Sequence, residues 1–177
     1  MHDMPSAKNL YYFVWPTAWG PMGAVAGDQG IRRIVLPHYT QDDLAALLAW
    51  EHPGAVEGRE PFERLVELSR AFLNGKRVDF ADVGIDLPSG ESFSGVVYRA
   101  CRSIPYGETL SYSALAKQIG RPDAARAVAT AMSKNPTPLI VPCHRVIYAD
   151  GRAGGFSAEG GEALKRRLLV LEAGAGA

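Results

Sequence analysis

Residues 113–133, SALAKQIGRPDAARAVATAMS, have the pattern of two short helices joined by a tight turn. The first predicted helix covers residues 113–119 and ends at Gly120, which suits the left-handed position that follows many helices. The second covers residues 123–133 and begins with Asp123, an acidic side chain at the positive end of the helix dipole. Two short helices joined by a few residues that include glycine are typical of a helix-turn-helix.

The second helix of this motif is nearly smooth, because alanine occupies five of its positions and Arg126 projects alone from the middle. A helix that reads base edges in the major groove carries several Asn, Gln or Arg side chains. This helix is therefore poorly suited to reading a sequence. We interpret it as a helix that slides close to a nucleic acid backbone and inserts one arginine. The alternative interpretation is an alanine-rich helix packed in the core.

The charges of the chain are divided unevenly, although 19 basic and 19 acidic residues give a net charge of zero. Residues 1–87 carry 8 Lys/Arg and 12 Asp/Glu, whereas residues 88–177 carry 11 Lys/Arg and 7 Asp/Glu. The basic second half agrees with a polyanionic partner.

The chain before the helix-turn-helix predicts one more helix of the same unit and, ahead of a linker, a separate α/β unit. Residues 92–104 have the apolar spacing of one helix face, and Cys101 lies on that face as a core residue. Pro88-Ser89-Gly90 is the best linker candidate. The earlier elements are strands at 11–15, 22–26 and 31–36, a helix at 41–51 capped by Thr40, a helix from Pro61 to Leu73, and a possible return to the sheet at 77–87. We therefore expect an α+β fold with an α/β domain over residues 1–87 and a helical domain over residues 88–177.

Composition excludes several classes of protein. Apolar residues make up 47% of the chain, enough for a core, but no apolar run approaches the roughly 20 residues that span a bilayer. The N-terminus lacks the basic and apolar segments of a signal peptide, so a cytoplasmic protein without membrane contact is expected. Two cysteines, Cys101 and Cys143, are too few for a disulfide framework or a Cys-based zinc site, and no metal or other cofactor is expected.

Cys143 has the setting of a pre-positioned nucleophile. It follows the apolar run of residues 139–141, which is bounded by Pro138 and Pro142 and is expected to be buried, extended and stiff. His144 supplies a base and Arg145 a positive charge, and both favour the reactive thiolate. The alternative is a buried, inert Cys143 beside a surface-exposed His144.

Several blocks of the second half closely resemble the O6-alkylguanine-DNA alkyltransferases, also called methylated-DNA–protein-cysteine methyltransferases. The blocks are IPYGETLSYSALAKQIG, AARAVATAM, NPTPLIVPCHRV, GGF and LKRRLLVLE, in the family's order and spacing over about residues 90–172. The resemblance implies irreversible transfer of an alkyl group from O6-alkylguanine, with O4-alkylthymine as a further candidate, to Cys143. It also implies a ribonuclease-H-like N-terminal sheet, a winged helix-turn-helix, a monomer, and double-stranded DNA bound through the minor groove.

The same resemblance assigns roles to individual residues. His144 would deprotonate Cys143 through a water, Glu172 would orient His144, and Asn135 would fix the turn before the cysteine. Tyr112 would crowd the DNA phosphates and later donate a hydrogen bond to the departing guanine. Arg126 would be the finger that replaces the flipped nucleotide, with Ala125 and Ala127 beside it on the DNA. The residues implied around the flipped base are Pro138, Met132, Phe156 and Ser157.

The chain also departs from the family pattern. Ala129 and Thr130 stand where many members have glycine, and the stretch 158–161, AEGG, is longer than usual. Glu159 and Glu162 are expected to place negative charge beside the pocket. Arg166-Arg167 replaces a common aromatic residue, so the last helix should pack differently.

Three other functions compete with this hypothesis. A lesion-flagging relative would lack the acceptor cysteine, and Cys143 argues against it. A transcriptional regulator would need more base-reading side chains on the second helix. A Cys-His hydrolase would need an oxyanion hole and turnover, and no motif indicates either.

Overall fold

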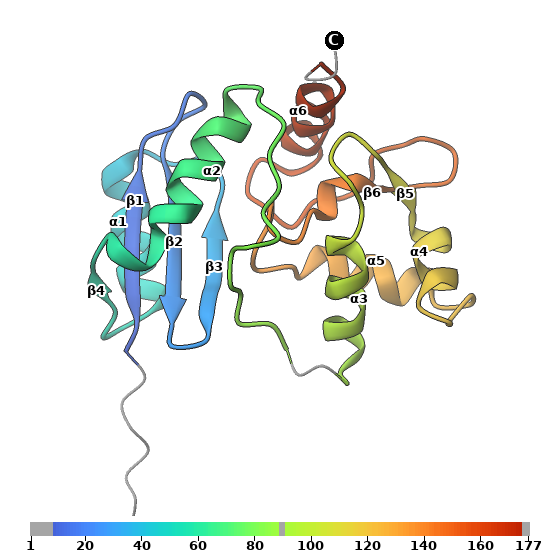
Figure 1. Ribbon diagram of the computed structural model, residues 1–177, viewed down its shortest axis with the longest axis horizontal. Helices are drawn as coiled ribbons and strands as arrows, with labels where there is room; N and C mark the ends of the chain where they lie inside the picture. Colours follow the sequence, from blue (N-terminus) through green and yellow to red (C-terminus); the bar gives the residue numbers. More distant parts are fainter. Residues whose placement is uncertain (1–8, 89–90, 175–177) are drawn as a thin grey trace, which may run out of the picture.

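Four strands of the first half form a mixed sheet in the order β3-β2-β1-β4 (Figure 1). Aromatic and β-branched residues favour β1 and β3, and the tight Asp28-Gln29 turn joins β2 to β3 as an antiparallel pair. The strands are β1 (Tyr11–Trp15), β2 (Met22–Gly27), β3 (Gly30–Val35) and β4 (Val56–Glu57). The computed structural model describes residues 9–88 and 91–174.

Helices cover both faces of this sheet. On one face, α1 (Gln41–Glu51) buries Leu44 and Leu48 against Val25 and Val35, and the Thr40 hydroxyl caps its first turn as predicted. On the other face, η1 (Glu60–Phe62) leads into α2 (Glu63–Leu73), which packs on the larger apolar cluster of the sheet. The expected strands and both helices of the first half are confirmed.

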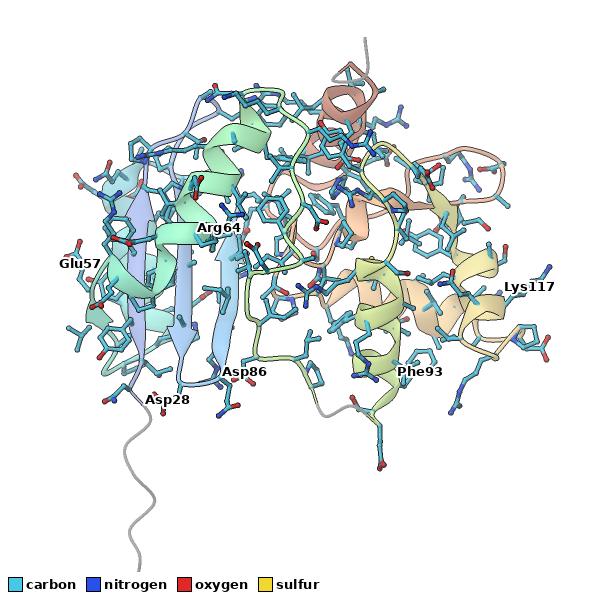
Figure 2. The ribbon with its side chains drawn as sticks, in the orientation of Figure 1. Asp28, Glu57, Arg64, Asp86, Phe93 and Lys117 are labelled. Carbon is cyan, nitrogen blue, oxygen red and sulfur yellow. The ribbon has the colours of Figure 1, made fainter. Side chains whose placement is uncertain are left out.

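The segment after α2 returns to the sheet at one point but forms no strand there, so that part of the prediction is confirmed only in part. Residues 77–87 contact β3 at a single bridge, between Ile31 and Ile85, and at the flanking backbone bonds. Figure 2 shows Asp86 beside the end of β3 where the chain turns from Asp28. The carbonyls of Phe80, Ala81 and Val83 bind the Arg102 side chain, so they are not available for a ladder with β3.

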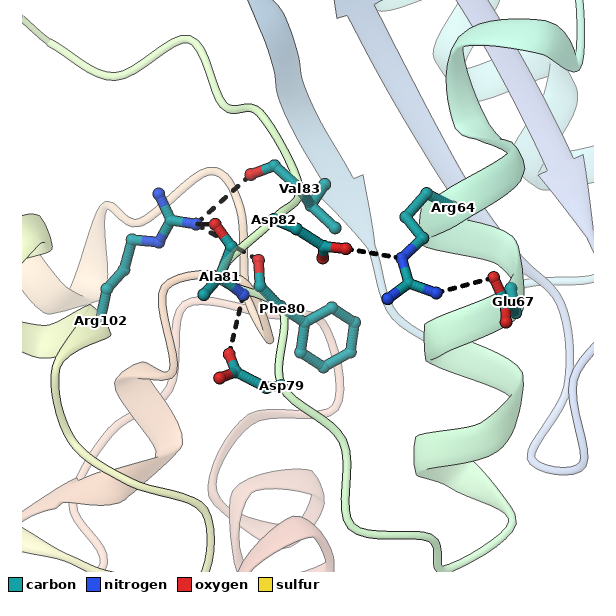
Figure 3. Close-up of polar contacts among 8 residues, drawn as sticks. All are labelled: Arg64, Glu67, Asp79, Phe80, Ala81, Asp82, Val83 and Arg102. Atoms are coloured by element: carbon teal, nitrogen blue, oxygen red, sulfur yellow. Dashed lines mark hydrogen bonds and ion pairs between the residues drawn. The ribbon is translucent and has the colours of Figure 1, made fainter.

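Arginine side chains from both halves hold this connecting segment (Figure 3). From α2, Arg64 binds Asp82 at 2.8 Å. From the helical half, Arg102 donates to the carbonyls of Phe80, Ala81 and Val83, each at 3.3 Å. The segment therefore joins the two halves. Of the predicted linker, Ser89 and Gly90 lie outside the described residues, and the boundary at 87/88 stays a prediction.

The second half is helical, with a two-stranded parallel pair between β5 and β6. The helix-turn-helix is formed by α4 and α5, and Gly120 has the expected positive φ of 74°. The second helix begins at Ala125, so Asp123 lies in the turn and not at the helix start as expected. The elements are α3 (Phe93–Arg102), β5 (Leu110–Ser111), α4 (Tyr112–Gln118), α5 (Ala125–Ser133), η2 (Cys143–Arg145), β6 (Val146–Ile147) and α6 (Gly161–Gly174). The predicted α+β class is confirmed.

The two halves meet along β3 and α6. Leu139 and Ile140 belong to the apolar cluster of the sheet together with Leu164 and Leu168 of α6. The Ile34 amide of β3 donates to the Pro136 carbonyl at 2.8 Å. The segment that leads to Cys143 thus lies between the sheet and the helical half.

Candidate active site

A buried turn, and not an extended segment, delivers Cys143 to the start of η2. Residues 139–141 are buried as expected, but Leu139 has a φ of 73° and the Val141 amide donates to the Thr137 carbonyl at 3.0 Å. The prediction of an extended run is wrong, because proline restricts its own φ and the residue before it but leaves the residues between two prolines free to turn. A left-handed leucine costs about 1–2 kcal/mol, so surrounding contacts must hold it.

Asn135 supplies three of those contacts from one side chain. Its Nδ2 donates to the Val141 carbonyl at 2.8 Å and to the Cys143 sulfur at 3.1 Å, and its Oδ1 accepts from the Thr137 amide at 3.0 Å. The side chain is buried, so these bonds are not exposed to competing water. Asn135 therefore closes the turn and fixes the sulfur at its end.

Glu172 of α6 lies at the centre of a buried polar cluster. Its Oε1 is 2.7 Å from His144 Nε2 and accepts from Arg145 Nη2 at 2.8 Å. Arg145 Nε lies 3.1 Å from both carboxylate oxygens, and the Gly107 amide donates to Oε2 at 3.1 Å. The alternative of a surface-exposed His144 is excluded, because His144 is fully buried.

The protonation of this cluster follows from its electrostatics. Burial raises the pKa of Glu172, but the hydrogen bonds from His144 and Arg145 outweigh it and bring the pKa to about 2. Burial lowers the pKa of His144, so the imidazole is neutral near pH 7. An ionised carboxylate only accepts hydrogen bonds. We therefore assign the ring proton to Nε2, which leaves Nδ1 as the basic nitrogen.

His144 Nδ1 is buried and has no hydrogen-bond partner within residues 9–88 and 91–174. A buried lone pair without a partner is uncommon and marks a position of functional interest. The pair Glu172–His144 thus has the arrangement of a base whose tautomer is held by a carboxylate.

The Cys143 sulfur is buried among weak polar contacts. Burial raises the pKa of its thiol, and the hydrogen bonds from Asn135 and Ser157 and the charge of Lys165 lower it in part. Ser157 Oγ lies 3.8 Å from the sulfur. Arg145, which was expected to favour the thiolate, has its guanidinium on Glu172 instead. The resting side chain is a thiol, so a reaction at sulfur requires removal of its proton.

Lys165 is a residue of this site that the sequence interpretation missed. It is 1% exposed, and its ammonium donates to the Tyr112 hydroxyl, the Val146 carbonyl and the Gly155 carbonyl at 3.2, 2.6 and 3.2 Å. Burial lowers its pKa to about 8 and raises that of Tyr112 to about 12. The missed signal is its spacing of seven residues from Glu172, which puts both charges on one helix face with Leu168.

The structure brings most of the expected pocket residues together. Met132, Tyr112 and Cys143 share one apolar cluster, Pro138 is buried, and Phe156 packs against both this cluster and that of the sheet. On α5, Arg126 and Ala127 are exposed and Ala125 is half-buried, with Val128 and Met132 turned into the core. The alternative of α5 as a core helix is thus true of one face only.

The expected surplus of negative charge at the AEGG stretch is balanced by arginines. Glu159 pairs with Arg33 of β3 at 3.4 Å, and Glu162 pairs with Arg166 at 2.5 Å. Arg167, at the position where an aromatic residue is common, lies with its guanidinium carbon 3.6 Å from the centre of the Trp19 ring.

Within the part of the chain that the structure describes, no helix is long and apolar enough to cross a membrane. The same residues contain no group of three or more His, Cys, Asp or Glu side chains that could hold a metal ion.

Comparisons with known proteins show the family of this chain. Residues 92–174 match the family model of the 6-O-methylguanine DNA methyltransferase, DNA binding domain. Over 176 residues the chain is 35% identical to a methylated-DNA–protein-cysteine methyltransferase of Methanothermobacter thermautotrophicus, and the match covers 97% of this chain and 89% of the relative. The chain belongs to the family of methylated-DNA–protein-cysteine methyltransferases.

Solved structures of the family have the same fold along nearly the whole chain. The crystal structure of O6-methylguanine methyltransferase from Mycobacterium tuberculosis is 34% identical, with a TM-score of 0.76 and 94% of each chain covered. The structure of the Mycobacterium tuberculosis protein in complex with DNA gives the same identity and TM-score, with 93% of this chain and 94% of that chain covered. The likeness therefore includes the N-terminal sheet, where the sequence resemblance is weaker.

The hydrogen bond from Asn135 lowers the pKa of the Cys143 thiol, so Asn135→Ala should move the titration of this thiol to higher pH. Ser157→Ala should move it in the same direction by less, because its contact with the sulfur is longer. The measurement is the ultraviolet absorbance of the thiolate as a function of pH, recorded as the difference from Cys143→Ser. An equal or larger shift for Ser157→Ala would contradict the geometry described here.

Proposed function

We propose that this chain repairs alkylated DNA by transferring the alkyl group of O6-alkylguanine to the sulfur of Cys143. The observation that carries the proposal is the buried thiol of Cys143, fixed by Asn135 beside a neutral His144 whose Nε2 is held by Glu172. Membership of the methyltransferase family, with a DNA-binding domain over residues 92–174, supports DNA as the partner.

The proposed step is a direct displacement at carbon. The thiol proton passes to His144 Nδ1, by way of a water as the family resemblance implies. The sulfur then forms a bond to the alkyl carbon while the carbon–O6 bond breaks, and its electron pair remains on the guanine. The base takes up one proton, so the products are guanine in DNA and an S-alkylcysteine. A neutral His144 with its proton on Nε2 is suited to the first transfer.

Tyr112 is the proposed donor to the departing guanine. Its raised pKa keeps the phenol protonated near pH 7, and the Lys165 ammonium donates to its oxygen at 3.2 Å. A cation on the phenol oxygen stabilises the charge that develops when the phenol gives up its proton. Lys165 therefore acts through Tyr112 in this proposal.

The reaction is proposed to occur once per molecule. The thioether has no proton to lose, cannot form a thiolate and holds the alkyl group by a stable carbon–sulfur bond, so the sulfur does not return to its starting state. The protein would act as a monomer in the cytoplasm and be consumed in proportion to the lesions that it repairs.

The burial of Cys143 requires that the target base leave the DNA stack. The residue is 2% exposed, and an O6-alkyl carbon within a duplex is out of its reach. Extrusion of a base costs a few kcal/mol. Arg126, exposed on the smooth helix α5, is the proposed finger that fills the vacated space, and Ala125 and Ala127 allow that helix to approach the minor groove.

Transfer to Cys143 is tested by the mass of the intact protein after incubation with a duplex that contains one O6-methylguanine. The wild type should gain one methyl group per molecule, and peptide mapping should place it on Cys143. Cys101→Ser should gain it at a nearly normal rate, because Cys101 is buried on α3 and its raised pKa keeps it a thiol. Cys143→Ser should gain nothing. A methyl group on Cys101, or none on the wild type, would refute the proposal.

The role of Arg126 is tested by comparing duplex DNA with a free base. Arg126→Ala should slow transfer from O6-methylguanine in a duplex about tenfold, since about 1.4 kcal/mol of the extrusion energy corresponds to this factor. Transfer from free O6-benzylguanine, which needs no extrusion, should be nearly unchanged. Arg64→Ala on α2, also an exposed arginine, serves as the matched control and should leave both rates unchanged. Equal losses on both substrates would remove the finger role.

A further inference from the structure

Two consecutive residues of strand β3 contact two segments that lie near Cys143. The Ile34 amide donates to Pro136 in the turn that ends at Cys143. The Arg33 side chain reaches the segment that follows Ser157, where its Nη2 lies 3.4 Å from Glu159 Oε1. The N-terminal sheet is therefore in direct contact with the segments on either side of the sulfur.

Arg33 pairs with one carboxylate on α1 and with another on the segment that follows Ser157. Its Nε and Nη2 lie 3.2 and 3.4 Å from the two carboxylate oxygens of Glu51 on α1. The side chains of Arg33 and Glu159 are 24% and 27% exposed, so both are partly shielded from solvent. Burial lowers the pKa of Arg33, but the carboxylates of Glu51 and Glu159 outweigh it and raise the pKa. Arg33 thus joins α1 to the pocket wall.

The wall that Arg33 holds is the segment from Phe156 to Glu159. Phe156 packs against both apolar clusters, Ser157 Oγ is 3.8 Å from the Cys143 sulfur, and Ala158 is buried in the cluster of the sheet. Ser157 is only two residues from Glu159. The position of the Glu159 carboxylate therefore affects how closely Ser157 approaches the sulfur.

The backbone beyond Glu159 adds little restraint of its own. Gly160 and Gly161 follow, with φ values of 96° and 56°. Glycine without a side chain moves readily among backbone conformations. In the longer AEGG stretch of this chain, the ion pair between Glu159 and Arg33 of β3 thus lies next to the most adaptable part of the backbone.

We propose that Arg33 is a positioning residue that, through Glu159, holds Ser157 against the Cys143 sulfur and so limits the size of the alkyl group that the pocket admits. This inference rests on the alkyl transfer proposed above and adds a determinant of its substrate range. With the ion pair intact, a methyl group is held in line with the sulfur. Without it, Ser157 retreats, a methyl group is positioned less well, and a benzyl group gains room.

The test compares rate constants of transfer from O6-methylguanine and O6-benzylguanine placed at the same position of one duplex. Arg33→Ala and Glu159→Ala should each lower the methyl rate about three- to fivefold, the range expected for a partly shielded ion pair. The benzyl rate should fall less or rise, so the ratio of benzyl to methyl rates increases. The double variant should match Arg33→Ala, because Glu159→Ala removes a contact that Arg33→Ala has already removed.

Arg32→Ala is the matched control, because Arg32 is the neighbouring arginine of β3 and pairs with Asp86 at 3.3 Å, away from Glu159. It should leave the ratio unchanged. The melting temperature of each variant separates a shift in specificity from a loss of stability. A uniform fall of both rates, additive effects in the double variant, or the same shift in Arg32→Ala would overturn the proposal. Failure of the underlying function would look different, since the wild type itself would then gain no alkyl mass.

Discussion

The arrangement around Cys143 depends on the hydrogen bonds and ion pairs that the Glu172 carboxylate accepts. A buried carboxylate is tolerated only when it is fully paired, and removal of one partner costs about 3–5 kcal/mol. Glu172 of α6 meets this demand with groups from two other segments: η2, through His144 and Arg145, and the loop after α3, through the Gly107 amide. The three segments cannot shift independently without leaving a buried charge unpaired, so the same bonds that satisfy Glu172 also fix the tautomer of His144.

A second constraint comes from the sheet. Its edge strand β3 binds the turn before Cys143 at Pro136, and the leucine and isoleucine of that turn fill the cluster of the sheet. The sulfur itself lies in the cluster of the helical half. The left-handed Leu139 is thus held by packing on one side and by Asn135 on the other. In this account the sheet is part of the frame of the site, although it contributes neither the acceptor nor the base.

The sequence predicted what local chemistry determines. The Thr40 cap, the helix face of residues 92–104 and the glycine after the first helix of the helix-turn-helix all appear where the pattern placed them. The turn at Leu139 was missed because proline restrains its neighbours without specifying the residues between two prolines. Lys165 was missed because its partners lie 10 to 53 positions away. The contact between His144 and Glu172, 28 positions apart, was expected from family resemblance alone, since no local rule connects them.

The central claim is that the Glu172 carboxylate makes His144 the base that removes the Cys143 proton. The most direct measurement is the pH dependence of the rate of Cys143 alkylation by O6-benzylguanine in the wild type and in Glu172→Gln, with folding of each confirmed by circular dichroism. Glutamine keeps the shape but not the charge, so His144 becomes a weaker base. The account predicts a larger loss of rate at about pH 7 than at about pH 9, where hydroxide assists thiol ionisation. An unchanged pH profile in a well-folded Glu172→Gln protein would contradict it.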